Sequence, residues 1–330
     1  MVRETEISNQ FGFRIYDCIP KKGVYLLKTD KGDKCLKKIS YGIQKLNYIY
    51  KAKNHIVSNG FERVDRYNLS LNNNPYALVN EDIYIVTDWI DGREADFKIL
   101  EDVKIAARTL AKFHIAARGF DLEENLKVRC DVGKLPYVLE KRLRTLKKMK
   151  EMAQKNKKKT EFDMLYLSNV DSFYELAKNS YETINMESYK KVCDMSLIEK
   201  VLCHHDYTYH NILIKNPDEV YLVDFDYLKS EVQVYDLSTL IVKTLKRVDW
   251  NIDYAVVILK EYSSIRELTS DEKEVLKTLL KFPQRFWRLA NRYYYKEAAW
   301  TEATFLKKMK EIVDEKDRYL EFLSKLDEIL

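Results

Sequence analysis

The sequence has few cysteines, and they are scattered. The five cysteines form no C-x-x-C pair: Cys18, Cys35, Cys130, Cys193 and Cys203. An odd number of widely spaced cysteines argues against a disulfide framework, and the lack of paired cysteines argues against a structural zinc site. This usage is typical of a protein that stays in a reducing cytoplasm.

Long apolar runs are also missing. No uninterrupted stretch approaches the roughly 18 apolar residues that span a bilayer. The first residues, MVRETEISNQFGFRIYD, do not contain the apolar core of a secretion signal. We therefore expect no membrane insertion, and we expect synthesis in the cytoplasm.

The excess of one charge over the other is small, and turn-forming residues are few. The 57 Lys and Arg residues are nearly balanced by 52 Asp and Glu residues, so the net charge is only +5. This composition does not require a nucleic-acid partner, and we predict none. With 8 Gly and 5 Pro in 330 residues and 46% hydrophobic residues, the chain is predicted to be ordered, globular and rich in helix.

The first 90 residues predict a small antiparallel sheet. Apolar and polar residues alternate in FRIYDCIP, VYLLKTD and KCLKKIS, and turn residues separate these segments. A helix with apolar residues at helical spacing follows and ends at Asn59-Gly60, and a hairpin then ends in a strand from Tyr84 to Trp89. We predict that this strand completes the small sheet, which carries the one helix.

Helical periodicity dominates from Lys98 onward, so a second, mainly helical lobe is predicted. The predicted fold is therefore α+β and bilobal, with residues 1–90 as the small lobe and residues 91–330 as the large lobe. The stretch from Lys141 to Lys159 holds ten Lys or Arg residues and one Glu. A solvated helix face is the favoured interpretation of this stretch, and a site for an anionic polymer or lipid is the alternative.

Polar residues gather in HHDYTYHNILI, His204 to Ile214, and in YLVDFDYL, Tyr221 to Leu228. The three histidines suggest zinc, but they are five or six residues apart across a loop, which is not the spacing of a zinc helix or finger. A nucleophile triad is not supported either, because no Ser or Cys lies on a predicted strand-turn-helix elbow. His204 is predicted to pack at a strand end and His205 to stabilise the loop.

Phosphoryl transfer fits this pattern better. It requires a carboxylate that orients the acceptor hydroxyl and oxygen ligands that hold Mg²⁺ against the nucleotide phosphates. Asp206 and Asn211 have the spacing D-x4-N, and Asp224 ends the strand that follows. Lys37, on the third predicted strand, is placed to meet the α- and β-phosphates, whereas Lys38 should point to the other face of the sheet.

These segments resemble the aminoglycoside phosphotransferase and choline kinase superfamily, which has a protein-kinase-like fold. HHDYTYHNILI is similar to the HGDLHPGNIL loop of that superfamily, and VYLVDFDYLKSEVQVYDLSTLI is similar to its metal-binding strand and following helix. Three further strings resemble CotS-type spore coat proteins: DWIDGRE, AKFHIAARGF and FPQRFWRLANRYYY. The resemblance runs over nearly the whole chain.

The resemblance implies a role for each site residue. Asp206 would act as the general base or hydroxyl-orienting group, Asn211 and Asp224 would bind Mg²⁺, and Lys37 would bind the phosphates of ATP. It also implies that the backbone near Asp88 and Ile90 binds adenine and that Asp236 supports the loop. Asp226 would be a second candidate metal ligand. The small lobe would bind nucleotide, and the large lobe would hold the catalytic loop and the acceptor site.

The chain departs from the superfamily pattern at two places. Only Gly23 lies where a glycine-rich loop could cover the phosphates, and no Asp or Glu occurs between Ile43 and Asn59 to pair with Lys37. His55 lies at a plausible position on that helix instead. Two functions are therefore carried forward. The leading one is an ATP- and Mg²⁺-dependent phosphotransferase acting on a small-molecule or carbohydrate hydroxyl, made in the mother cell and assembled into the spore coat with other coat proteins. The alternative is a catalytically silent structural coat protein.

Overall fold

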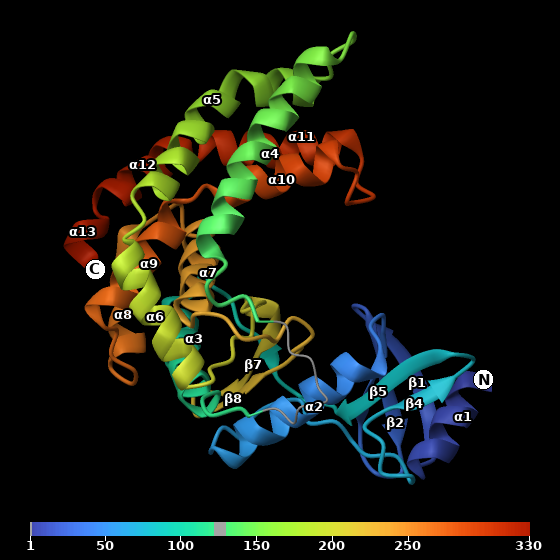
Figure 1. The fold of residues 1–330 in the computed structure, drawn as a ribbon. Helices are drawn as coiled ribbons and strands as arrows, with labels where there is room; N and C mark the ends of the chain where they lie inside the picture. Colours follow the sequence, from blue (N-terminus) through green and yellow to red (C-terminus); the bar gives the residue numbers. More distant parts are fainter. Residues whose placement is uncertain (1, 122–129) are drawn as a thin grey trace.

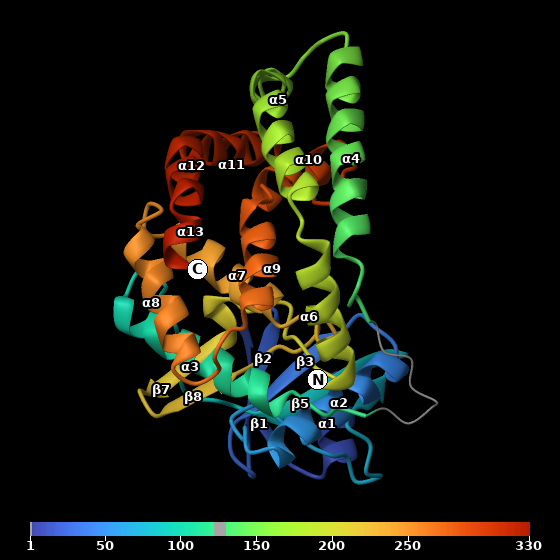
Figure 2. The ribbon, with the colours of Figure 1, turned by 60° about the vertical axis from the view of Figure 1, so that its left-hand side comes forward.

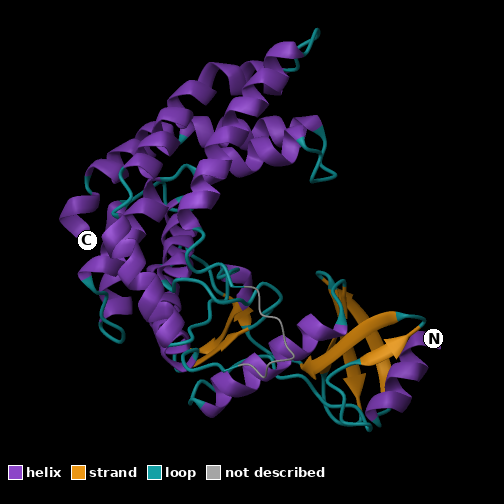
Figure 3. Cartoon of the chain, viewed as in Figure 1, coloured by secondary structure: helices purple, strands orange, loops and turns teal. Residues whose placement is uncertain are grey.

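A computed structural model describes residues 2–121 and 130–330 of the chain. The molecule has a small antiparallel sheet at one end and a long helical part that curves away from it (Figure 1). Strands occur in two separate places, and almost all the remaining regular structure is helical (Figure 3). This arrangement confirms the predicted α+β class, with a small sheet and a larger helical part.

The larger sheet has five strands in the order β1-β2-β3-β5-β4, and every neighbouring pair is antiparallel. Gly23, between the first two strands, has a φ of 81°, a left-handed conformation that glycine adopts without strain. The three N-terminal strands and the later hairpin were predicted. Their bounds are β1 (Ile15–Lys21), β2 (Val24–Thr29), β3 (Lys34–Ile39), β4 (Ala77–Val79) and β5 (Asp82–Asp88).

An N-terminal helix, α1 (Val2–Phe11), covers part of this sheet. Ile7 and Phe11 of the helix are buried with Leu27 and Leu36 of the strands in a separate small core. This helix was not predicted from the sequence, because its apolar residues are few and their helical spacing is weak.

The next helix, α2 (Ile43–Ser58), packs mainly against the helical part of the molecule. Its buried residues Leu46 and Ile56 belong to the same hydrophobic core as Phe113 of α3. The ring of Tyr48 meets that of Phe120 with their centroids 5.7 Å apart. The predicted helix is present, and its apolar face is buried in the large core, which also includes residues of β3 and β5. In Figure 1, α2 lies between the two parts.

The helical part contains a long antiparallel pair, α4 and α5, which stand side by side and project away from the sheets (Figure 2). A capping box formed by Thr160 and Asp163 starts α5. The bounds are α3 (Leu100–Ala116), α4 (Leu135–Lys155), α5 (Glu161–Glu182), α6 (Met186–Ile198), α7 (Val234–Leu245), α8 (Ile252–Ser263), α9 (Ser270–Lys281), α10 (Gln284–Tyr294), α11 (Glu302–Asp314), α12 (Lys316–Ser324) and α13 (Leu326–Ile329). Within the described ranges, no helix has the length and apolar character needed to cross a bilayer.

A second, three-stranded sheet positions the polar motifs. It has the order β6-β7-β8, and a short 3-10 helix at Tyr209–Asn211 leads into β7. The strands are β6 (Arg93–Glu94), β7 (Ile212–Asn216) and β8 (Glu219–Leu222). The hairpin β7-β8 was predicted, and it brings the loop before β7 next to the loop after β8.

Candidate functional site

The loop from His204 to Asn211 is held in place by Asp236 of α7. The carboxylate of Asp236 is buried and accepts hydrogen bonds from the backbone N–H groups of His204, at 2.7 Å, and His205, at 2.9 Å. Burial alone would raise the pKa of Asp236, but hydrogen bonding and the charges of nearby histidines, above all His114, outweigh it and hold the pKa below its usual range. Asp236 therefore supports the loop, as predicted.

His204 links the loop to the segment that follows β8. Its Nε2 is 3.0 Å from the backbone oxygen of Val223, and its Nδ1 is 3.3 Å from the backbone nitrogen of Asp206. Since a backbone N–H can only donate, Nδ1 accepts and Nε2 carries the proton. The ring is fully buried and lies against Phe225 with centroids 4.7 Å apart. The predicted packing role of His204 is confirmed.

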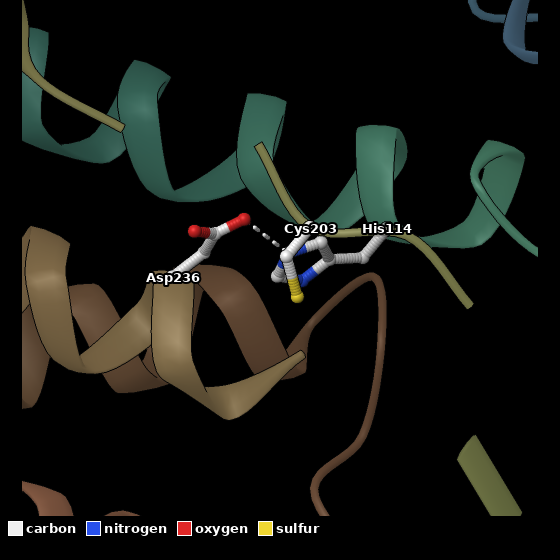
Figure 4. Close-up of side chains that lie close together, drawn as sticks. All are labelled: His114, Cys203 and Asp236. Atoms are coloured by element: carbon white, nitrogen blue, oxygen red, sulfur yellow. Dashed lines mark hydrogen bonds and ion pairs between the residues drawn. The ribbon is translucent and has the colours of Figure 1, made fainter. Parts of the chain in front are cut away.

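One group of potential metal ligands lies within 4.8 Å of one another in the described part of the chain: His114, Cys203 and Asp236. Figure 4 shows these side chains converging from α3, the start of the loop and α7. Each already has a hydrogen-bond partner, with His114 Nδ1 2.7 Å from the hydroxyl of Tyr262 and Cys203 donating to the carbonyl of Glu231. Burial raises the pKa of Cys203 well above its usual range, and a metal-bound thiol must lose its proton. The group is therefore a hydrogen-bonded core network.

The histidines of the motif do not form the zinc site considered at first. His204 is used as described above, and the exposed ring of His210 points to Glu94 of β6, with 2.5 Å between Nδ1 and the carboxylate. His205 has a φ of 67°, and its ring stacks on Tyr235 of α7 at 4.1 Å between centroids. These contacts hold the loop, as predicted for His205.

Asp206 and Asn211 are in direct contact. The side-chain nitrogen of Asn211 donates to the carboxylate of Asp206, at 3.1 Å, and to its backbone oxygen, at 2.9 Å. The Asn211 side chain therefore keeps its oxygen as a further acceptor. Lys243 of α7 approaches the other carboxylate oxygen of Asp206 at 3.3 Å. Burial lowers the pKa of Lys243, although Asp206 opposes that effect.

Lys37 reaches the loop after β8. Its Nζ lies 2.8 Å from carboxylate oxygens of both Asp224 and Asp226. Burial alone would lower the pKa of Lys37, but the two carboxylates outweigh it and raise the pKa. The hydroxyl of Tyr41 donates to the other oxygen of Asp226 at 2.7 Å. Lys38 points away and pairs with Asp82 on the other face of the sheet, as predicted.

The backbone ties the two loops together. The N–H of Val223 donates to the carbonyl of Asn211 at 3.0 Å, so Asp224 follows directly after a residue bonded to the backbone of the His204–Asn211 loop. Asp224 has a φ of 63°, a left-handed conformation that is uncommon outside glycine. The structure thus brings Lys37, Asp206, Asn211 and Asp224 into one region from three separate segments.

The helix α2 contacts this region through a lysine. Lys53 is buried, and its Nζ is 2.7 Å from the carboxylate of Asp65. The other oxygen of Asp65 accepts the backbone N–H of Asp224 at 3.3 Å. His55, by contrast, lies 2.7 Å from the backbone oxygen of Arg118. The suggestion that His55 takes the place of the missing helix carboxylate was wrong, because its side chain is committed to the end of α3.

The segment predicted to meet adenine leaves the larger sheet at the end of β5. The carboxylate of Asp88 is exposed and pairs with Lys34. The Trp89 N–H donates to the Asp33 carbonyl at 2.9 Å, and the Gly92 N–H donates to the Ile90 carbonyl at 3.0 Å. Among the described residues, no hydrogen bond uses the backbone N–H of Ile90.

A cavity of about 270 Å³ opens beside Asp206, between α7 and the segment that starts α10. A larger cavity of about 880 Å³ lies next to it, along α4. Four residues line both cavities, namely Arg142, His205, Tyr235 and Leu279. Sequence patterns did not reveal these cavities, because their walls come from helices far apart in the chain.

The fold and the site together define the kinase-like class of small-molecule phosphotransferases. The features of that class are an antiparallel sheet with an inward lysine, a D-x4-N loop, and aspartates that follow a hairpin. A solved aminoglycoside phosphotransferase from Alicyclobacillus acidocaldarius has this fold, with a TM-score of 0.87, 22% identity, and coverage of 99% of this chain and 96% of that one. The chain belongs to the family described as "Spore coat putative kinase YutH", whose model matches residues 4–326.

Two further similarities agree with this assignment. Spore coat protein S of Bacillus subtilis (strain 168) is 22% identical over 324 residues, which cover 97% of this chain and 89% of that protein. Spectinomycin phosphotransferase APH(9)-Ia, solved with ADP and spectinomycin, has a TM-score of 0.67 and 13% identity, with 97% of each chain covered. Choline kinases are also among the structural neighbours. The predicted recognition is confirmed, and at these identities the solved structures show the fold alone.

Proposed function

We propose that this protein is an ATP- and Mg²⁺-dependent phosphotransferase that acts on a hydroxyl of a small molecule or carbohydrate. The observation that carries the proposal is the meeting of Lys37, Asp224 and the Asp206–Asn211 pair, which come from three distant segments. The solved complex of spectinomycin phosphotransferase with ADP supports the use of a nucleotide by this fold.

Each side chain then has a distinct task. Asp206 accepts a hydrogen bond from the acceptor hydroxyl and takes its proton as the hydroxyl oxygen bonds to the γ-phosphorus of ATP. The bond between that phosphorus and the β,γ-bridging oxygen breaks in the same step, and ADP leaves with the bridging oxygen. Asn211 orients Asp206, which it contacts at 3.1 Å. Lys37 binds the α- and β-phosphates, and the backbone at Asp88 and Ile90 receives the adenine ring.

The side chains near Asp224 fit a magnesium ion. The Asn211 side chain uses its nitrogen on Asp206 and keeps its oxygen, and the carboxylates of Asp224 and Asp226 add further hard oxygen donors. Asn211 and Asp224 would hold the ion, with Asp226 as the additional candidate. When bound, Mg²⁺ neutralises charge on the nucleotide phosphates.

Lys37 is positioned without a carboxylate on α2. In kinases a helix glutamate fixes the corresponding lysine. Here Asp224 and Asp226 hold Lys37 directly, at 2.8 Å each, and Tyr41 in turn holds Asp226. These contacts provide the ordering of the lysine that an active site requires.

The same feature favours the second candidate function. Because Lys37 is bound to Asp224, it occupies part of the carboxylate that would bind Mg²⁺. Such an arrangement is expected in a kinase-like cleft that no longer catalyses transfer. In that case the protein is a structural coat component that acts through other coat proteins. In both cases we place its synthesis in the cytoplasm of the mother cell and its final location in the spore coat, since the family is a spore coat family.

Calorimetry with ATP and Mg²⁺ separates the two functions. We expect the wild type to bind ATP·Mg²⁺, and we expect Lys37→Met to weaken binding by about tenfold or more because the phosphates lose a charge-assisted contact. Lys38→Met is the matched control, since Lys38 faces away from the cleft and pairs with Asp82, and it should bind like the wild type. No detectable binding by the wild type at millimolar ATP contradicts the phosphotransferase and supports the structural function.

A further inference from the structure

The cavity beside Asp206 has walls that carry mostly positive charge. Two acidic residues, Asp206 and Glu315, are among the described lining residues. The cationic lining residues come from three helices or their ends, and they are Arg142 of α4, Lys243 of α7 together with Lys246 just after its end, and Arg285 and Arg288 of α10. A pocket with this excess of cations attracts anions and repels cations.

The two acidic residues are already engaged. Glu315 pairs with Arg285 and accepts a hydrogen bond from Trp250 Nε1 at 3.1 Å. Asp206 is contacted by Lys243 at 3.3 Å. Arg142, Lys246 and Arg288 are left: among residues 2–121 and 130–330, no carboxylate forms an ion pair with any of them.

The unmatched cations line one cavity and lie near other cationic or aromatic side chains. Arg142 lies over the ring of Trp287, 4.7 Å from its centroid, and over that of Phe282 at 5.5 Å. Partial burial, followed by the charges of Arg285 and Lys243, lowers the pKa of Lys246 to about 8, although its side chain still reaches solvent. Burial lowers the pKa of Arg142 too, and the charge of Arg288 contributes. Keeping such groups together is unfavourable unless an anion lies between them.

The neighbouring cavity has the same sign. It is lined by Lys141, Arg144 and Lys148 of α4 as well as Arg142. These residues belong to the basic stretch from Lys141 to Lys159, for which a solvated helix face was the favoured interpretation. Lys150 pairs with Asp171, and the exposed residues Lys141, Arg144 and Lys148 also line the cavity that His205 borders.

We propose that the acceptor is a small alcohol that carries a phosphate or carboxylate group. This inference rests on the proposed phosphotransferase function. The anionic group lies among Arg142, Lys246 and Arg288, and the hydroxyl reaches Asp206. A volume of about 270 Å³ is near the lower end for small-molecule pockets, which favours an acceptor of about monosaccharide size. The pocket is unsuited to cationic acceptors such as aminoglycosides or choline.

Matched acceptors test the sign of the charge. Binding to the full chain is measured by calorimetry for glycerol 3-phosphate, glucose 6-phosphate, gluconate and inositol monophosphate, and for glycerol, glucose, inositol, glucosamine and choline. We expect at least one anionic alcohol to bind about tenfold or more tightly than its uncharged counterpart, and we expect no measurable binding of the cations. Failure of all four anionic alcohols to bind at millimolar concentration overturns the proposal.

Charge-reversal variants locate the binding. Arg288→Glu and, separately, Lys246→Glu should each weaken binding of the anionic alcohol by about tenfold or more, because a like charge then faces the ligand. Both side chains are exposed, so these variants are expected to fold, which melting temperature checks. The matched control is Lys310→Glu, an exposed residue of α11 outside the cavity, which should bind like the wild type. Unchanged binding in both variants overturns the assignment.

The failure of this inference can be told apart from failure of the proposed function. Asp206-dependent transfer from ATP to an uncharged or cationic alcohol, without anion preference, overturns the anionic acceptor and leaves the phosphotransferase intact. The opposite result is a wild type that binds the anionic alcohol tightly but does not bind ATP, together with loss of the anion binding in Arg288→Glu. That result supports the anion site and contradicts the phosphotransferase.

Discussion

Glu231 is a buried acid in the segment between β8 and α7. Burial raises its pKa from 4.5 to about 7, although its carboxylate accepts the N–H of Val232 at 2.9 Å. The folded protein therefore binds this proton more tightly than the unfolded chain does. The stability that the protonated group contributes is present below pH 4.5 and is lost as pH rises through about 7.

We predict that Glu231→Gln stabilises the protein at pH 8 and changes it little at pH 5. The gain at pH 8 should be up to about 3 kcal/mol, because the variant removes a buried charge that the wild type must carry there. Urea unfolding at both pH values measures the difference. The exposed Glu62→Gln is the control and should give the same small effect at both. Equal stabilisation by Glu231→Gln at pH 5 and pH 8 contradicts this account.

At the scale of elements, α2 is joined to the site by the ion pair of Lys53 and Asp65. Lys53 is buried, its Nζ lies 4.1 Å from the centroid of the Tyr67 ring, and Asp65 also accepts the N–H of Asp224. Burial lowers the pKa of Lys53, and Asp65 opposes this. Removing one partner would leave the other charge in a low-dielectric environment.

Asp65→Ala should therefore destabilise the protein by about 3–5 kcal/mol in urea unfolding. Asp171→Ala is the control, since it breaks the exposed pair with Lys150 and should cost less than about 1 kcal/mol. The double variant Lys53→Met with Asp65→Ala should be less destabilised than the sum of the single changes, because no unpaired charge is left. A cost for Asp65→Ala no greater than that of Asp171→Ala would show that the pair does not hold α2.

At the scale of the whole molecule, local patterns predicted most of the architecture. Alternating residues gave β1, β2, β3 and β5, and the turn between two short apolar runs gave the β7-β8 hairpin. The packing of α2 against the helical part was not predicted, because a helical apolar stripe shows that a face is buried but not what buries it. The division at residue 90 stays a prediction. The chain leaves the larger sheet at Asp88 and joins the smaller one at Arg93.

The candidate site was predictable only where its residues follow one another in a motif. Asp206, Asn211 and Asp224 lie within one loop and hairpin, and Lys37 is fixed by strand alternation. Lys243 and Lys53 were missed because nothing in their local sequence distinguishes them from the many other lysines. Their roles arise from tertiary contacts that bring α7 and α2 to the loop. The same reason hid the cationic cavity, whose walls combine α4, α7 and α10.

The central claim is that Asp206 is the base of a phosphoryl-transfer site. Transfer from γ-labelled ATP to the anionic alcohols, measured for wild type and Asp206→Asn, tests it most directly. We predict that the variant binds ATP·Mg²⁺ and melts like the wild type but transfers phosphate about 100-fold more slowly or worse, as expected for loss of a general base. Asp218→Asn, in the β7-β8 turn, is the exposed control and should transfer normally. Transfer by Asp206→Asn at the wild-type rate would contradict the account.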